Sequence, residues 1–142
     1  MSNHVFHEIY LHINWHTKRD QPQILPRLEP MLYKMIKQRC IETKGVYFHE
    51  VGGTETHIHV GINIEPMVNI SEFIGELKGF VSHEINALEG GKVLEWQRGF
   101  GVVSFSKRQL KWVCDYIRNQ KEHHAQGTLS EKLERYDSEE DA

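Results

Sequence analysis

Hydrophobic and polar residues alternate in the first part of the chain. Between residues 6 and 17 apolar and polar side chains alternate, and the apolar positions are Ile9, Leu11, Ile13 and Trp15. This alternation is typical of a strand with one buried face. Residues 46–51 and 56–64 are two further β-rich runs, and the glycines between them favour a hairpin. Residues 102–106 predict a last strand.

Helical spacing of apolar residues separates these strands. It predicts one helix from Leu28 to a C-cap near Gly45, one that Asn69 or Ser71 caps, and one over residues 108–126. The resulting order is strand, helix, strand, strand, helix, strand, helix. It indicates an α+β fold, with a ferredoxin-like or RRM-like antiparallel sheet, helices packed on it and an additional C-terminal helix.

Composition sets the domain boundaries. With 142 residues, 39% of them hydrophobic and 26% charged, we expect a single domain over residues 1–130. Residues 131–142 hold six acids and two bases, which predicts a disordered acidic tail. Cys40 and Cys114 lack a CxxC partner, which argues against a disulfide framework or a zinc ribbon. No run of 18 apolar residues and no signal pattern occurs, so we expect a cytoplasmic protein without a membrane partner.

The formal net charge of −3 is unevenly distributed. Residues 92–121 contain seven bases and two acids, a local charge of +5 that predicts a basic face, although a solvated helix explains such a run as well. Trp96 and Phe100 are better candidates for stacking on bases than Trp15 and Trp112. If the basic face binds a nucleic acid, the candidates for contacts with its phosphates are Lys18, Arg19, Lys78, Arg98, Lys107 and Arg108.

Two histidines in the third predicted strand suggest a metal site. His57 and His59 flank Ile58, so the pleat places both imidazoles on one face. Imidazole is a common ligand of divalent transition metals. Alone the pattern is weak, because such a pair also occurs on exposed polar faces.

The last predicted helix adds a tyrosine and an amide. Tyr116 and Gln120 are four residues apart and therefore share a helix face, which His123 or His124 continues. A phenol is a poor nucleophile at neutral pH and needs activation, or a more electrophilic target. A divalent metal would polarise a phosphate beside it. Surface residues at the edge of a packed helix have the same spacing.

Taken together, these motifs resemble the single-tyrosine HUH transposases of the insertion-sequence 200/605 type and their domesticated relatives. The resemblance covers residues 5 to about 126 and rests on the stretches LHINWHTKR (11–19), THIHVGI (56–62), LKG (77–79), WQRGFGVVSFS (96–106) and DYIRNQKEHH (115–124). It implies that His57, His59 and Gln120 bind Mg²⁺ or Mn²⁺ and that Tyr116 attacks a phosphate of single-stranded DNA. The product would be a 5′-phosphotyrosine, at hairpin or repeat ends. It also implies a homodimer in which the tyrosine helix of one subunit serves the histidines of the other.

One position departs from the pattern, and two other functions remain open. The family often has an acid directly before the first histidine, whereas this chain has Thr56 there and Glu55 one place earlier. An outer carboxylate orients a ligating imidazole, so Glu55 is the candidate replacement. An RRM-like module that binds single-stranded nucleic acid without catalysis is one alternative. A metalloenzyme that activates water, with Tyr116 as a bystander, is the other.

Overall fold

Four strands form one antiparallel sheet in a computed structural model that describes residues 4–137. The strands are β1 (Ile9–His16), β2 (Val46–Gly53), β3 (His57–Ile64) and β4 (Gly101–Phe105). Their order across the sheet is β2-β3-β1-β4, with β1 and β3 in the centre. This is the strand order of a ferredoxin-like βαββαβ unit, and the fold class predicted from the sequence is confirmed.

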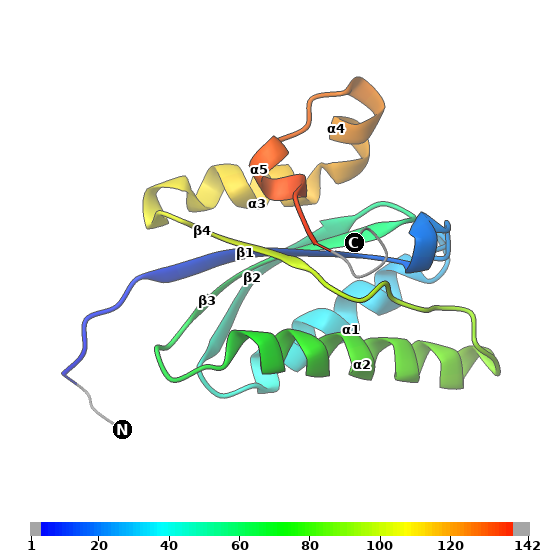
Figure 1. Ribbon diagram of the computed structural model, residues 1–142, viewed down its shortest axis with the longest axis horizontal. Coiled ribbons are helices and arrows are strands. Elements are labelled where there is room, and N and C mark those ends of the chain that lie inside the picture. Colours follow the sequence, from blue (N-terminus) through cyan, green and yellow to red (C-terminus); the bar gives the residue numbers. More distant parts are fainter. Residues whose placement is uncertain (1–3, 138–142) are drawn as a thin grey trace.

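Helices α1 (Glu29–Glu42) and α2 (Ile70–Glu89) cover one face of the sheet (Figure 1). The main core lies between them and the strands, and alternate residues of β1 and β3, such as Ile13, Trp15 and Ile58, are fully buried there. The predicted cap of α2 is present, because the side chain of Asn69 accepts a hydrogen bond from the backbone N–H of Glu72. No helix within residues 4–137 is long and apolar enough to cross a membrane.

The opposite face of the sheet is covered by the C-terminal third of the chain. A 3₁₀ turn η2 (Lys107–Gln109) leads into α3 (Leu110–Arg118), which is followed by α4 (Gln120–Gln126) and α5 (Glu131–Glu134) (Figure 1). The sequence predicts one continuous helix over 108–126, whereas the structure breaks it at Asn119, where φ is −102° and ψ is 29°. A second, smaller core of Phe105, Val113 and Ile117 attaches α3 to the sheet.

Residues 131–137 depart from the expected disordered tail. Glu131–Glu134 form the short helix α5, which the side chain of Ser130 caps. Leu133 is only 3% exposed, so one apolar side chain anchors an otherwise acidic segment. The remaining residues of the predicted tail, 138–142, lie outside the described part of the chain.

Candidate active site

The pairing of β1 with β3 brings two rows of polar side chains together on the sheet face below α3–α5. His16 pairs with His57 and Asn14 pairs with His59 in the antiparallel register. His57 is 2% exposed and His59 is fully buried. The two imidazoles therefore lie on one face, as the alternation in β3 predicts, and the helices above exclude solvent from them.

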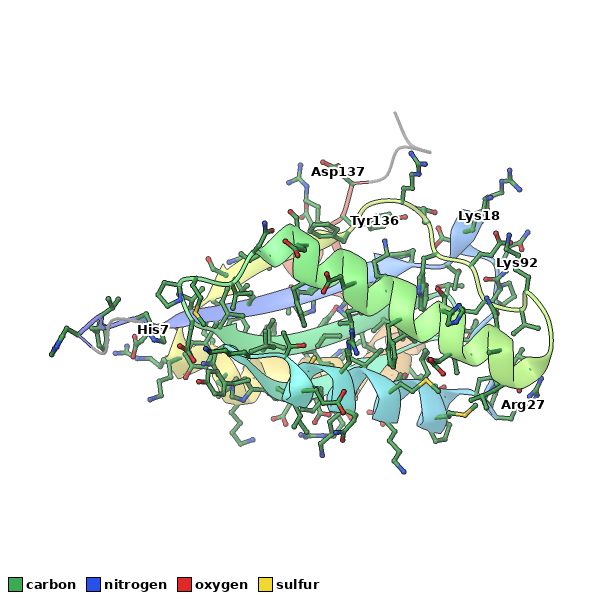
Figure 2. All side chains as sticks on the ribbon, turned by 90° about the horizontal axis from the view of Figure 1, so that it is seen from below. His7, Lys18, Arg27, Lys92, Tyr136 and Asp137 are labelled. Atoms are coloured by element: carbon green, nitrogen blue, oxygen red, sulfur yellow. The ribbon has the colours of Figure 1, made fainter. Side chains whose placement is uncertain are left out.

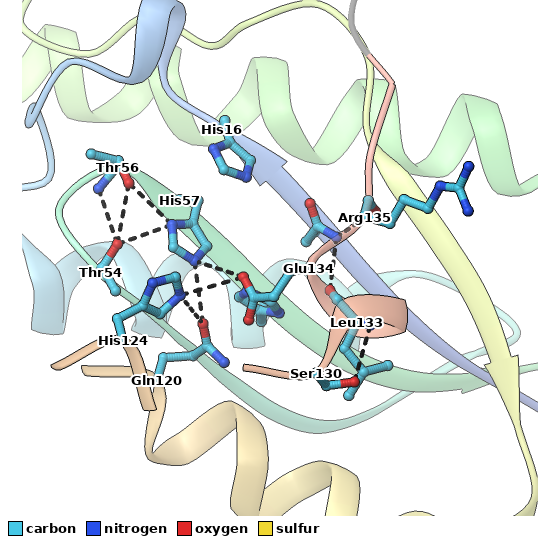
Figure 3. A network of polar contacts seen from close by, with 12 residues as sticks. His16, Thr54, Thr56, His57, Gln120, His124, Ser130, Leu133, Glu134 and Arg135 are labelled. Carbon is cyan, nitrogen blue, oxygen red and sulfur yellow. Dashed lines mark hydrogen bonds and ion pairs between the residues drawn. The ribbon is translucent and has the colours of Figure 1, made fainter. Parts of the chain in front are cut away.

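His57 is oriented by two threonine hydroxyls. Its Nδ1 lies 3.0 Å from Thr54 Oγ1 and 3.1 Å from Thr56 Oγ1. Glu55 is exposed and does not take the place of the acid that is missing before His57. The threonines hold the ring at Nδ1, and Nε2 points toward the space under α4 (Figure 3).

His59 is oriented by another histidine, His12 of β1. Its Nδ1 lies 2.7 Å from Nε2 of His12. Burial lowers the pKa of His59 to about 4 and also lowers that of His12, so both rings are neutral near pH 7. Within residues 4–137 the buried Nε2 of His59 makes no hydrogen bond of acceptable geometry, although the carboxylate oxygen Oε1 of Glu134 lies 3.3 Å from it. A neutral ring held at Nδ1 with a free Nε2 is the state that binds a metal.

The break between α3 and α4 leaves the predicted glutamine in place. Gln120 is fully buried, and its Oε1 lies 3.2 Å from Nε2 of His57. Its amide nitrogen donates to the backbone oxygen of Tyr116, at 3.3 Å. This hydrogen bond orients the amide so that its oxygen, Oε1, faces the histidines. The structure thus brings His57, His59 and Gln120 together within one chain.

Tyr116 lies on the same side of the sheet, and its ring centroid is 6.1 Å from that of His59. Only 3% of the residue is exposed. Its hydroxyl donates to Glu134 Oε2 and accepts a hydrogen bond from the backbone N–H of Ser130 at 2.9 Å. Burial, reinforced by the carboxylate of Glu134, raises the pKa of Tyr116 to about 12. The phenol is therefore protonated at neutral pH.

Two groups in the site were not among the predicted ligands. His124 Nε2 lies 3.2 Å from Gln120 Oε1, and Glu134 Oε1 lies 3.3 Å from both His59 Nε2 and His124 Nε2 and 3.4 Å from His57 Nε2. One ligand atom from each of His57, His59, His124 and Glu134 falls within 4.8 Å of the others (Figure 3). Burial by itself raises the pKa of Glu134, but the imidazoles of His57 and His59 beside its carboxylate outweigh burial and lower that pKa well below its usual range.

This donor set fits a divalent metal ion. Imidazole nitrogens together with carboxylate and amide oxygens suit manganese, iron, cobalt or zinc. The buried Nε2 of His59 makes no hydrogen bond of acceptable geometry among the described residues, and it lies 3.3 Å from Glu134 Oε1 in the cluster. Both strand histidines are held at Nδ1, the arrangement that outer partners impose on metal-ligating rings.

The predicted phosphate-binding residues do not form one surface. Lys18 and Arg19 follow β1 at the end of the strand where His57 lies, and the backbone N–H of Lys18 donates to Glu95 of the loop that carries Arg98. Lys107 and Arg108 line a depression with Glu8 near the start of β1. Figure 2 shows Lys18 and Lys92 at one end of the molecule and His7 at the other.

Lys78 has a structural position. Its ammonium donates to the backbone oxygens of Gln97 and Gly99, each at 2.9 Å, and so joins α2 to the loop before β4. These carbonyls use two of the three N–H donors of the ammonium. Lys78 therefore holds this loop in place, and its contact with DNA stays a prediction.

Two bases of the run 92–121 pair with acids from elsewhere in the chain. Arg118 Nη2 lies 2.7 Å from Glu50 Oε2, and Lys121 pairs with Glu29. Within the run, Lys111 and Arg118 both bind Asp115. The two outside acids, Glu50 and Glu29, therefore lower the local charge from +5 to +3.

The aromatic residues also differ from expectation. The indole N–H of Trp96 donates to the backbone oxygen of Lys78, and its ring packs edge-on against Trp15 at 5.8 Å, so Trp96 belongs to the packed interior. Trp112 is 56% exposed and stacks on Tyr116 with 5.6 Å between ring centroids. Trp112 is therefore an accessible aromatic residue beside the site.

Comparison with known proteins gives a family and a fold. A family model described as "Transposase IS200 like" matches residues 5–120. A Deinococcus radiodurans R1 protein assigned as a transposase is 16% identical, with a TM-score of 0.66 over 84% of this chain and 96% of the other. A REP-associated tyrosine transposase bound to a REP hairpin is also 16% identical, with a TM-score of 0.62 over 91% and 76%. No curated protein sequence matches significantly.

Proposed function

Because this chain belongs to the family of IS200-like transposases, we propose that it cleaves and rejoins single-stranded DNA through Tyr116 in a metal-dependent reaction. The observation that carries the proposal is the convergence of the Tyr116 hydroxyl and the Nε2 atoms of His57 and His59 on a single carboxylate. A nucleophile and a metal-binding set next to one another are the parts that phosphoryl transfer needs.

In the proposed reaction the Tyr116 oxygen attacks a DNA phosphorus. The Tyr116 hydroxyl gives up its proton to solvent as the Oη–P bond forms, the P–O3′ bond breaks, and the 3′ oxygen takes up a proton from solvent and leaves as a hydroxyl. A divalent ion held by His57, His59 and Gln120 would supply positive charge beside the scissile phosphate. The N–H of Ser130, which already binds the Tyr116 oxygen, lowers the cost of the charge that develops there. Religation follows the same path in reverse.

The substrate proposed is a single-stranded DNA hairpin or repeat end, in transposition or in the mobilisation of repeats. The similar REP-associated transposase was solved with a REP hairpin, and this supports the choice of a hairpin probe. An RRM-like binding module is disfavoured, because α3, α4 and α5 cover the sheet face that such a module would offer to bases. A second copy of the chain remains a proposed partner.

The decisive experiment incubates the protein with a fluorescent single-stranded hairpin and Mn²⁺. A covalent adduct should appear on a denaturing gel, and mass spectrometry should place the nucleotide on Tyr116. Tyr116→Phe keeps the ring and should abolish the adduct while Mn²⁺ binding survives. Cleavage at wild-type rate by Tyr116→Phe would instead assign the reaction to metal-activated water.

A further inference from the structure

The C-terminal segment is built into the site by specific contacts. The amide of Asn14, which is 1% exposed, donates to the backbone oxygens of Leu133 at 2.9 Å and Arg135 at 3.0 Å. Gly101 makes room for the segment, because a Cβ at that position would lie 2.0 Å from the oxygen of Arg135. Together with the burial of Leu133, these contacts fix the direction of the side chain between them, Glu134.

The two oxygens of Glu134 face different partners. Oε1 faces the Nε2 atoms of His57, His59 and His124 at 3.3–3.4 Å, and Figure 3 shows the carboxylate beside His57 and His124. Oε2 accepts the hydrogen bond from Tyr116. An N–H···O hydrogen bond is normally about 2.9–3.0 Å long, and here three nitrogens lie at nearly equal, longer distances. If the carboxylate were hydrogen-bonded to a single imidazole, Oε1 would lie closer to one nitrogen than to the other two.

The distances instead match ligands arranged around a common centre. For metal–ligand bonds of about 2.1 Å, neighbouring ligand atoms are about 3.4 Å apart in a tetrahedron and about 3.0 Å apart in an octahedron. The separations of Oε1 from the three nitrogens fall in this range, as do those of Gln120 Oε1 from His57 and His124, at 3.2 Å each.

We propose that Glu134 bridges the metal and the nucleophile: Oε1 joins His57, His59 and His124 as a metal ligand while Oε2 holds the hydroxyl of Tyr116. The inference rests on the proposed function, since it assigns Glu134 a place in that same site. It makes the short acidic helix α5 part of the active site. Glu134 thus acts as a ligand toward the metal and as a positioning residue toward Tyr116.

The metal half is tested by calorimetric titration with Mn²⁺ in the absence of DNA. Glu134→Gln keeps the size of the side chain and should weaken Mn²⁺ binding about tenfold or more. Glu131→Gln changes an exposed acid of the same helix and is the matched control, which should bind like wild type. Loading with Co²⁺ should give a visible spectrum that Glu134→Gln alters and Glu131→Gln does not. Unchanged or tighter Mn²⁺ binding by Glu134→Gln would overturn the proposal and identify the carboxylate as a competitor of the metal.

The nucleophile half is tested by proton NMR of the Zn²⁺-loaded protein. The hydroxyl proton of Tyr116, assigned by its loss in Tyr116→Phe, should be visible in wild type and in Glu131→Gln and should be lost in Glu134→Ala. Persistence of this resonance in Glu134→Ala would overturn the bridge. Neither readout requires DNA cleavage. A wild-type protein that forms no covalent adduct would contradict the proposed function, whereas the role of Glu134 would still be decided by the metal titration and the NMR spectrum.

Discussion

The ring of Tyr116 stacks with two others, those of Trp112 and His123. Trp112 is 56% exposed although an indole of this size gains from burial. A base that arrives at Tyr116 with its phosphate would find the outer face of Trp112 open. We therefore expect Trp112 to stack on a nucleotide next to the scissile phosphate.

Replacing Trp112 should weaken DNA binding and leave the fold intact. Stacking of one base contributes about 1–3 kcal/mol, so Trp112→Ala should lower the affinity for a single-stranded hairpin about tenfold or more. Fluorescence anisotropy measures this, and Trp112→Phe should retain most of the affinity. Ile41→Ala removes an exposed apolar side chain from α1, on the opposite side of the sheet, and is the control. Equal binding by Trp112→Ala and wild type would contradict the stacking role.

Residue patterns predict the parts of the site that depend on local geometry. The alternation in β3 places His57 and His59 on one face, and helical spacing places Gln120 beside Tyr116. The contribution of His12 depends on the register between β1 and β3, which no pattern within β1 reveals. Its one sequence signal was its position on the polar side of a half-buried strand.

At the scale of elements, α2 is tied to the loop before β4 by Lys78. Burial lowers the pKa of this lysine to about 8, against about 10.4 for an unfolded chain. A neutral amine still has two N–H groups for the two carbonyls that Lys78 binds. Deprotonation thus removes the cost of a buried charge and keeps both hydrogen bonds.

Because of Lys78, the free energy of unfolding should therefore rise with pH. Between about pH 8 and pH 10.4 the unfolded chain holds more protons at Lys78 than the folded protein, so the contribution of Lys78 to the free energy of unfolding increases over that window. Below about pH 8 both states are protonated and the cost of burial is constant. Urea unfolding of wild type and Lys78→Met should show a difference that grows in favour of wild type from pH 8 to 10. Lys34→Met, an exposed change on α1, controls for the loss of one charge. A difference that stays constant with pH would rule out a titration of Lys78 in this range.

Elements with a long periodic pattern were predictable, and short ones that depend on tertiary contacts were not. The four strands and α1, α2 and α3 follow from hydrophobic spacing. The break at Asn119 has no glycine or proline to announce it. Helix α5 has four residues and a single buried side chain, Leu133, so its stability comes from Asn14 and the space above Gly101. Ser130, three residues before Leu133, was the one local signal of a helix start.

At the scale of the whole molecule, one chain contains every proposed active-site group. Ile117 packs over Gly61 of its own β3, where a Cβ would lie 3.1 Å from Ile117 Cδ1, and a Cβ on Gly52 would lie 2.1 Å from the oxygen of Ile117. Helix α3 thus fits closely onto the sheet of the same chain. The family resemblance implies instead that this helix serves a second subunit.

Mixing two inactive variants distinguishes these arrangements. Tyr116→Phe lacks the nucleophile but keeps the histidines, and His59→Ala lacks a ligand but keeps Tyr116. Because α3 docks on its own sheet, the mixture should form no covalent DNA adduct even after denaturation and joint refolding, which permits exchange of subunits. As a control, wild type refolded together with either variant should remain active, which shows that refolding succeeds. Sedimentation measures whether the copies associate. An adduct on the His59→Ala chain, identified by its mass, would mean that its tyrosine used the histidines of another copy, and the active site would then be shared between subunits.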